Sequence, residues 1–333
     1  MPRAAACTSG RPGRWPARAW RLGRRAVSLG AALGLVLAMA VAMSGCGGGG
    51  GAGPTDAPSG SSTSTVMGAT IHSIHTDTTY PLCIYLPAAS AGPRAKLPVI
   101  YVLDGESWFQ TLAGIVEGAH AAVIIVAVQS AGQRNRDFVP DNTCTPHGGG
   151  QARFLDFLRR ELVSYVESNV GGDPARRILF GHSHGGSFAL YALFAEPPVG
   201  HTFRTVLASD ASISCMPAAV LGWERAYATA FTALPVRLHL SCATQGNCAA
   251  NLEFAPVLAA RQHAGLVLQV QPYAGSHSGI VPQVLADGLA FALAGGPAPA
   301  GWQHPAVAPR IGAWTCTSSA ETPTPAGPRW CGH

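Results

Sequence analysis

Residues 176–191 read Arg-Arg-Ile-Leu-Phe-Gly-His-Ser-His-Gly-Gly-Ser-Phe-Ala-Leu-Tyr. The apolar run at residues 178–180 is typical of a buried strand, and residues 187–196 have the apolar spacing of a helix. Between them lies a Gly-x-Ser-x-Gly turn centred on Ser183. A strand, a tight turn and a helix around this motif define a nucleophile elbow, which raises the serine hydroxyl above the sheet. A chance Gly/Ser loop is the alternative, but the flanking strand and helix argue against it. We therefore predict that Ser183 is a nucleophile.

Strand and helix patterns alternate along the chain on both sides of the elbow. Two opening strands, an antiparallel pair, are expected at residues 66–75 and 79–86. Buried strands are predicted at residues 97–103, 123–128, 178–180, 205–208, 236–240 and 266–271. Helices are predicted at residues 107–117, 154–166, 187–196, 217–232, 252–264 and 281–293. This alternation predicts an α/β fold with a mostly parallel central sheet and helices on both faces.

The net charge of +5 over 333 residues comes from one end of the chain. Residues 1–25 hold seven arginines and no acidic residue, which leaves 15 of the 22 basic residues against all 17 acidic ones. No basic stripe remains in the part expected to fold, so the sequence argues against a nucleic-acid partner.

The N-terminal part has the layout of an export signal. The arginine-rich segment is followed by 18 uncharged residues, 26–43, and then by Ser44-Gly45-Cys46. We expect residues 1–45 to be a lipoprotein-type signal peptide, with Cys46 lipidated and holding the protein at the periplasmic face of a bacterial membrane. A cleaved secretory signal and an uncleaved anchor are the alternatives. Residues 46–65 are expected to form a Gly/Ser/Pro-rich tether, residues 66–296 a catalytic domain, and residues 297–333 a Pro/Trp/Cys-containing tail.

Export to an oxidising compartment explains most of the nine cysteines. We expect two local disulfides, Cys242–Cys248 and Cys316–Cys331, and a third, Cys144–Cys215, that joins two loops. Cys83 lies in a strand-like run and is expected to be a buried thiol. The spacings do not match a zinc site, and we expect neither a metal nor a cofactor.

A serine nucleophile needs a general base, which in elbow hydrolases is a histidine after the last strand. His277 has that place, in a loop of small residues before the final helix. His263 and His304 are placed less well, in a predicted helix and in the tail. His182 and His184 flank the nucleophile, so their side chains should diverge from it. We predict His277 as the base.

Several segments together resemble a known family. They occur in the order Leu103-Asp104-Gly105, Arg136-Asp137-Phe138 with Pro140, Phe154-Leu-Asp-Phe-Leu with Glu161-Leu162, Gly181-His-Ser-His-Gly-Gly186, and Ser276-His277-Ser278. Over residues 66–295 the chain resembles the bacterial serine esterases of the α/β-hydrolase fold, which include siderophore (enterobactin-type) esterases, feruloyl esterases and antigen-85-like acyltransferases. The resemblance implies an oxyanion hole formed by the backbone N–H groups of His184 and Glu106.

The third member of a catalytic triad is where the chain departs from this family. Relatives commonly carry an acid after the strand that corresponds to residues 236–241, but residues 242–248 contain no carboxylate. Three alternatives stay open. Glu253 reaches back from the next helix, Asp210 serves from the end of the preceding strand, or a Ser–His dyad works with Gln245 or a carbonyl orienting the histidine. We favour the dyad.

The expected function is hydrolysis of small-molecule carboxylic esters through an acyl-enzyme on Ser183, with siderophore-type or aromatic acyl esters as candidate substrates. Arg134 and Arg136 are candidates for holding an anionic substrate, or else are structural. An acyltransferase or thioesterase with the same acyl-enzyme is one alternative. A non-catalytic, hydrolase-like binding lipoprotein is the other.

Overall fold

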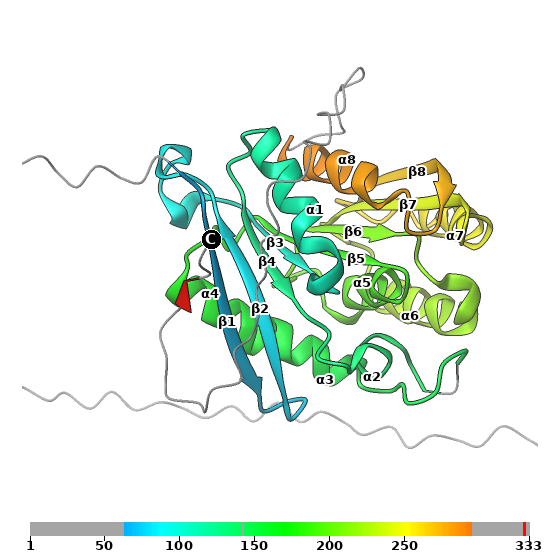
Figure 1. Ribbon diagram of the computed structural model, residues 1–333. Helices are drawn as coiled ribbons and strands as arrows, with labels where there is room; N and C mark the ends of the chain where they lie inside the picture. Colours follow the sequence, from blue (N-terminus) through cyan, green and yellow to red (C-terminus); the bar gives the residue numbers. More distant parts are fainter. Residues whose placement is uncertain (1–62, 142, 295–328, 331–333) are drawn as a thin grey trace, which may run out of the picture. The chain divides into compact units, whose positions relative to one another are not determined.

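The computed structural model describes residues 63–141, 143–294 and 329–330, and all structural statements below concern these residues. They form one sheet with the strand order β8-β7-β6-β5-β3-β4-β2-β1-β9 (Figure 1). The strands are β1 (Thr65–Ser73), β2 (Thr78–Leu86), β3 (Val99–Val102), β4 (Ile124–Val128), β5 (Arg177–His182), β6 (Thr205–Ser209), β7 (Arg237–Gln245), β8 (Val267–Ser276) and β9 (Arg329–Trp330).

Strands β3 to β8 are parallel, and β1 and β2 form the antiparallel opening pair. The register places Ile100 of β3 between Ile125 of β4 and Ile178 of β5. All three side chains are buried, as expected for central strands covered on both faces. Because the strands are parallel, the segments that follow β3, β5, β6 and β8 all emerge at the same edge of the sheet.

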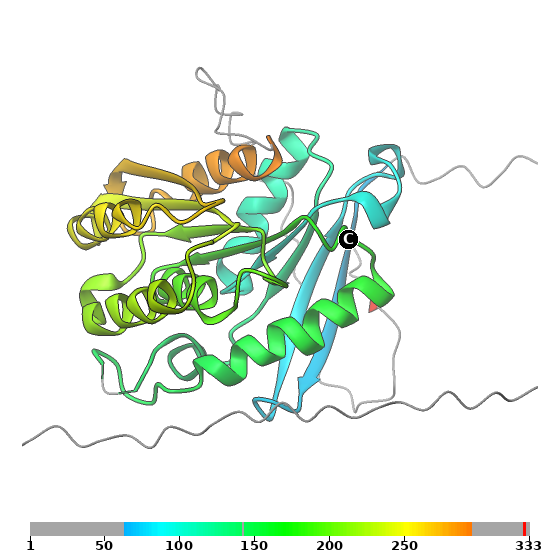
Figure 2. The ribbon, with the colours of Figure 1, turned by 180° about the vertical axis from the view of Figure 1, so that it is seen from behind.

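Helices cover both faces of the sheet. They are α1 (Gly105–Gly118), α2 (Arg134–Phe138), α3 (Gln151–Asp156), α4 (Val163–Asn169), α5 (His184–Ala195), α6 (Pro217–Ala230), α7 (Cys248–Ala260) and α8 (Val281–Leu293), with a π-helical turn η3 (Phe157–Leu162) joining α3 to α4 and single 3₁₀ turns η1 (Ala89–Ala91), η2 (Arg94–Lys96) and η4 (Ile213–Cys215). Helices α1 and α8 pack together on one face with their own core cluster. Helices α3 to α7 contribute to the core cluster on the other face. Figure 2 shows the ribbon from behind.

The predicted fold class is confirmed, and the predicted elements lie within a few residues of the observed ones. Two features were not foreseen. The segment predicted as the loop 129–150 contains the short helix α2, and residues 329–330 of the tail pair with β1. The predicted signal, the tether up to residue 62 and most of the tail lie outside the described residues. Among the described helices, none has the length and apolar character needed to cross a bilayer.

The cysteine pairing agrees with the sequence prediction where the structure describes it. Cys144 pairs with Cys215 across 71 residues, and Cys242 pairs with Cys248 across six. Cys83 is a buried thiol in β2. The predicted Cys316–Cys331 pair lies outside the described residues.

Candidate active site

Ser183 lies in the turn between β5 and α5 with the backbone geometry of a nucleophile elbow. Its φ of 61° and ψ of −120° are unusual for a non-glycine residue. A hydrogen bond of 2.9 Å from its backbone N–H to the carbonyl of Ser209 ties the turn to β6. Gly181 makes the turn feasible, because a Cβ there would lie 2.1 Å from the carbonyl oxygen of Gly185. The first glycine of the motif is therefore required by a close backbone approach.

His277 lies in the segment after β8, and its partner is Asp210. The Nδ1 atom of His277 is 2.5 Å from Oδ2 of Asp210, which follows directly after β6. The carboxylate is fully buried, whereas 37% of the His277 side chain is exposed. Since β6 and β8 end at the same edge of the sheet, two residues 67 positions apart in sequence meet there.

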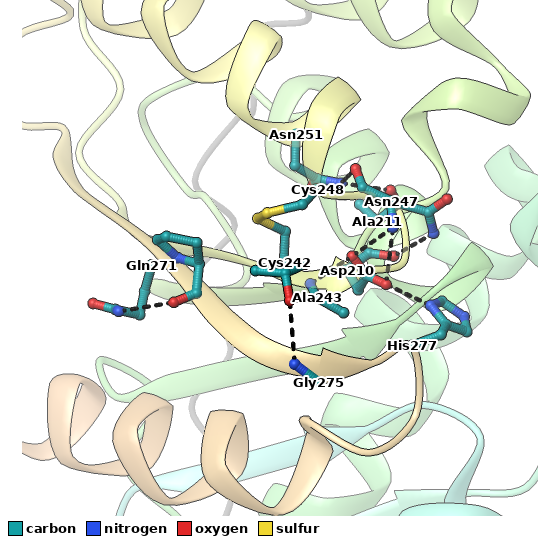
Figure 3. The surroundings of a disulfide bond; sticks show 12 residues. Asp210, Ala211, Cys242, Ala243, Asn247, Cys248, Asn251, Gln271, Gly275 and His277 are labelled. Carbon is teal, nitrogen blue, oxygen red and sulfur yellow. Dashed lines mark hydrogen bonds and ion pairs between the residues drawn. A yellow bond between two sulfur atoms is a disulfide. The ribbon is translucent and has the colours of Figure 1, made fainter.

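Backbone N–H groups from the end of β7 and from the turn after it hold the Asp210 carboxylate from the other side (Figure 3). Oδ1 accepts hydrogen bonds of 2.9 Å from Ala243 N–H and 3.0 Å from Asn247 N–H. A carboxylate that accepts several N–H groups is stabilised in its charged form. The Asp210 carboxylate can accept a hydrogen bond from Nδ1–H of His277, and in this tautomer Nε2 of the imidazole is available to accept a proton.

This contact decides among the three alternatives left open by the sequence. The preference for a Ser–His dyad is wrong, because the described structure gives His277 an acidic partner. Glu253 and Gln245 are both exposed, on α7 and at the end of β7 respectively, and neither is a hydrogen-bond partner of His277 among the described residues. Asp210 was one of the three alternatives, and the dyad was preferred only because the segment after β7 lacks the carboxylate that relatives carry there; the acid follows the neighbouring strand β6 instead.

Glu106 and His184, the two residues expected to supply oxyanion N–H groups, lie in the first turns of α1 and α5. The first N–H groups of a helix have no intrahelical acceptor and are available to a ligand. The two turns adjoin each other, since a Cβ on Gly185 would lie 3.4 Å from Oδ2 of Asp104. The Glu106 carboxylate accepts hydrogen bonds from Ser130 N–H, the shorter at 3.0 Å, so it is engaged elsewhere.

Arg134 links these two turns. Its Nε donates to Oδ1 of the buried Asp104 at 2.8 Å, and its Nη2 donates to the carbonyl of His182 at 3.3 Å. Burial raises the pKa of Asp104, and the Arg134 guanidinium opposes that shift. Arg136 pairs instead with Asp137 and donates to Tyr80. Of the two arginines considered for substrate binding, Arg136 is thus structural, and Arg134 braces the turns before α1 and α5.

His182 is a site residue that the sequence reasoning missed. Its ring was expected to diverge from the nucleophile, but its centroid lies 4.4 Å from that of His277. The Trp108 ring packs edge-on against that of His182, with the centroids 5.3 Å apart, and Nδ1 of His182 is hydrogen-bonded to Ser209 Oγ at 3.0 Å. Burial, together with the positive charges of His277 and Arg134, lowers the pKa of His182 to about 3. A histidine before the nucleophile was visible in the sequence, but its contacts depend on where β8 ends.

The hydroxyl of Ser183 is bonded to Ser212, with the two oxygens 3.2 Å apart. Ser212 N–H also donates to the Ser183 carbonyl at 3.1 Å. Among the described residues Ser183 Oγ is therefore held by a serine near the end of β6. Hydrogen bonds to a catalytic base are often long or misaligned in the absence of substrate and tighten when it binds.

Cys144, His184 and Cys215 are the one group of potential metal ligands found among the described residues, with ligand atoms within 4.8 Å of one another. Their disulfide takes up the two sulfur atoms. The cluster as folded thus offers a single imidazole, which falls short of the three or four protein ligands of a typical zinc site.

The parallel sheet, the elbow and the Asp210–His277 pair define the class of the protein as an α/β-hydrolase fold with a serine elbow. Residues 73–219 match the family model "Esterase: Putative esterase". Over these residues the chain is similar to this esterase family. The matched segment includes Ser183 and Asp210 and ends before His277.

Individual relatives that match in sequence are also named as esterases. The chain is 35% identical over 136 residues to the siderophore triacetylfusarinine C esterase of Aspergillus fumigatus, covering 36% of this chain and 46% of the relative. It is 30% identical over 189 residues to the ferri-bacillibactin esterase BesA of Bacillus subtilis, covering 48% and 64%. The chain therefore aligns with about half to two thirds of these relatives' length. An IroE-like serine hydrolase from Shewanella oneidensis is similar in structure, with a TM-score of 0.61 at 26% identity, covering 67% of this chain and 78% of that one.

Proposed function

We propose that this protein hydrolyses carboxylic esters through an acyl-enzyme on Ser183. The observation that carries the proposal is the pairing of His277 with the buried Asp210 at the sheet edge where the elbow raises Ser183. The match of residues 73–219 to the esterase family model supports the reaction class, as do relatives whose names describe siderophore esterases.

The proposed reaction has two steps. In the first, Nε2 of His277 accepts the Ser183 proton while Nδ1–H donates to Asp210, and the serine oxygen attacks the ester carbonyl. The backbone N–H groups of His184 and Glu106 stabilise the oxyanion, and one such donor is typically worth about 3 kcal/mol. His277 then gives its proton to the leaving alcohol. In the second step water, activated by His277 in the same way, releases the acid and restores Ser183.

Turnover of p-nitrophenyl esters from acetate to octanoate tests the reaction class, together with labelling by a fluorophosphonate. The intact protein should turn over these esters and take up the label, and Ser183→Ala should do neither. Ser164→Ala is the matched control, since Ser164 is an exposed hydroxyl on α4. An intact protein that gives neither turnover nor label contradicts the proposal.

We further propose that the substrate is a siderophore-type or aromatic acyl ester. The support is the likeness to relatives named for triacetylfusarinine C and ferri-bacillibactin, and the half-buried Trp108 beside the site. A panel containing a catecholate siderophore, a feruloyl ester and p-nitrophenyl esters should show the largest kcat/KM for one of the first two. A preference for short aliphatic esters would contradict this assignment of substrate but not the reaction class.

We also propose that the protein is exported and anchored to the cell envelope by lipid on Cys46. Two disulfides among the described residues support an oxidising compartment. The Cys46→Ser variant should move from the membrane fraction to the soluble periplasmic fraction. If the variant stays with the membranes, the lipid anchor is wrong.

A further inference from the structure

The acid partner of His277 is held by a turn that a disulfide closes. Cys242 lies near the end of β7, and Cys248 is the first residue of α7 (Figure 3). Between them lie residues 243–245, which end β7, and the turn of residues 246–247. Both hydrogen bonds to Oδ1 of Asp210 come from inside this ring, from Ala243 N–H and Asn247 N–H. The ring therefore supplies the backbone donors that fix the carboxylate opposite His277.

The same turn also holds the backbone around Asp210. The side-chain amide of Asn247 donates to the carbonyl of Asp210 at 3.0 Å, and that of Asn251 donates to the carbonyl of Ala211 at 2.8 Å. The backbone of Asp210 has a φ of 40°, which is unusual for a residue other than glycine. Hydrogen bonds from this segment therefore hold both the side chain and the main chain of Asp210.

The fit between turn and carboxylate is close. A Cβ on Gly246 would lie 2.3 Å from Oδ2 of Asp210, the oxygen that His277 contacts. A small shift of the turn would therefore push the carboxylate or withdraw its donors. Two features allow this segment to move. Residues 244–246 are exposed, and the pairing of β7 with β8 changes register between Ala243 and Gln245.

The Cys242–Cys248 bond is the covalent element that limits this freedom. Its sulfurs lie in the interior, since Cys242 and Cys248 expose 1% and 8% of their surface. It fastens the end of a strand to the start of a helix, on either side of the two donors. A crosslink over such a short ring reduces the conformations open to the residues inside it.

We propose that the Cys242–Cys248 disulfide is a positioning element for the proposed reaction, which keeps the Ala243 and Asn247 donors in place so that Asp210 orients His277. This inference rests on the proposed function for its catalytic consequence, but its structural core is independent of it. The disulfide acts through Asp210 and makes no contact with substrate.

The first test replaces both cysteines in the full-length protein, as Cys242→Ala with Cys248→Ala. We expect kcat for p-nitrophenyl acetate to fall by about 10- to 100-fold, because small misplacements of catalytic groups have effects of this size. KM should stay within about twofold, since the groups that bind the ester are untouched. A variant whose kcat equals that of the intact protein overturns the proposal.

A second measurement needs no substrate. The Nδ1–H of His277 donating to Asp210 should give a far-downfield proton NMR resonance, to be assigned by its loss in His277→Gln. We expect the resonance to weaken or disappear in Cys242→Ala with Cys248→Ala. It should persist in Cys144→Ala with Cys215→Ala, which removes a disulfide with a longer loop and thus controls for a general loss of stability. If it persists in both, the proposal is wrong, whether or not the protein hydrolyses esters.

A reversible form of the experiment covers a double variant that does not fold. In the Cys144→Ala, Cys215→Ala background, a dithiol transfers two electrons and two protons to the Cys242–Cys248 disulfide and becomes a cyclic disulfide itself. The His277 resonance should diminish on reduction and return on reoxidation. A resonance that is unaffected while thiol titration shows Cys242 and Cys248 reduced contradicts the proposal.

Discussion

Replacing Asp210 with asparagine tests the acid partner most directly, because the hydrogen bonds around it dictate how the amide will lie. Two N–H groups point at the Oδ1 position, from Ala243 at 2.9 Å and Asn247 at 3.0 Å. The amide oxygen of the introduced asparagine should take that place, since an NH₂ group there would face two donors. The NH₂ group must then face Nδ1 of His277, where Oδ2 stands in the intact protein.

The expected consequence is the wrong histidine tautomer. An NH₂ group can only donate, so Nδ1 of His277 becomes an acceptor and the proton moves to Nε2. A protonated Nε2 cannot take the proton of Ser183. The corresponding change in a serine-protease triad lowers kcat by about 10⁴-fold, which is about 5.5 kcal/mol of transition-state stabilisation. We expect a loss of that order in kcat, with KM little changed because the interaction is made chiefly in the transition state.

The assay is steady-state hydrolysis of p-nitrophenyl acetate by Asp210→Asn, with a thermal melt to establish the folded fraction. Glu253→Gln is the matched control, because it neutralises an exposed carboxylate on the neighbouring helix α7. The control should keep its kcat within about twofold of the wild-type value, as expected for a surface substitution that removes no contact of the catalytic residues. If folded Asp210→Asn keeps more than about a tenth of the wild-type kcat, Asp210 does not orient the base.

Three further predictions concern stability. Burial lowers the pKa of His239 from 6.5 to about 4, so between these pH values the unfolded chain binds a proton that the folded chain does not. The unfolding free energy measured by urea titration should therefore drop by roughly 3 kcal/mol as the pH falls from 6.5 to about 4, and this drop should be smaller in His239→Phe. Arg134→Met leaves the buried Asp104 without its cation, which should lower the free energy of unfolding by about 2–3 kcal/mol in the same measurement. An unchanged urea midpoint would mean that the Arg134–Asp104 pair does not stabilise the fold. Removing the Cys144–Cys215 disulfide, which closes a loop over 71 residues, should cost about 4 kcal/mol, and a loss below about 1 kcal/mol would mean that the loop is ordered without it.

The fold was predictable because its signals are local. Apolar runs such as residues 123–128 mark strands buried on both faces, and the observed β4 covers residues 124–128. The elbow needs only a strand, a turn and a helix in sequence, and Gly181 satisfies a close approach within that same segment. The same holds for the Cys242–Cys248 pair, whose partners are six residues apart.

The same local signals placed Asp210 among three alternatives but could not select it as the partner of His277. It depends on which strand lies beside which, and β6, β7 and β8 are neighbours only once the sheet has formed. The segment after β7 contains no carboxylate, and this absence led to the preference for a dyad. In the folded protein that segment supplies N–H donors to Asp210 instead of an acid of its own. The carboxylate that is absent from the loop after β7 is therefore supplied by Asp210, which follows the neighbouring strand β6.

The paired imidazoles raise a question about where the serine proton goes in the proposed reaction, since His182 and His277 are 4.4 Å apart. His182 is buried, and a charge on it would also be repelled by Arg134 and by a protonated His277, so its pKa is lowered to about 3. It therefore stays neutral near pH 7, and its ring can pack against a charged His277 without like-charge repulsion. His277, by contrast, is half-exposed and has the Asp210 carboxylate at Nδ1. Burial thus keeps His182 neutral and leaves the proton-accepting role in the proposed reaction to His277, whose Nδ1 is hydrogen-bonded to Asp210.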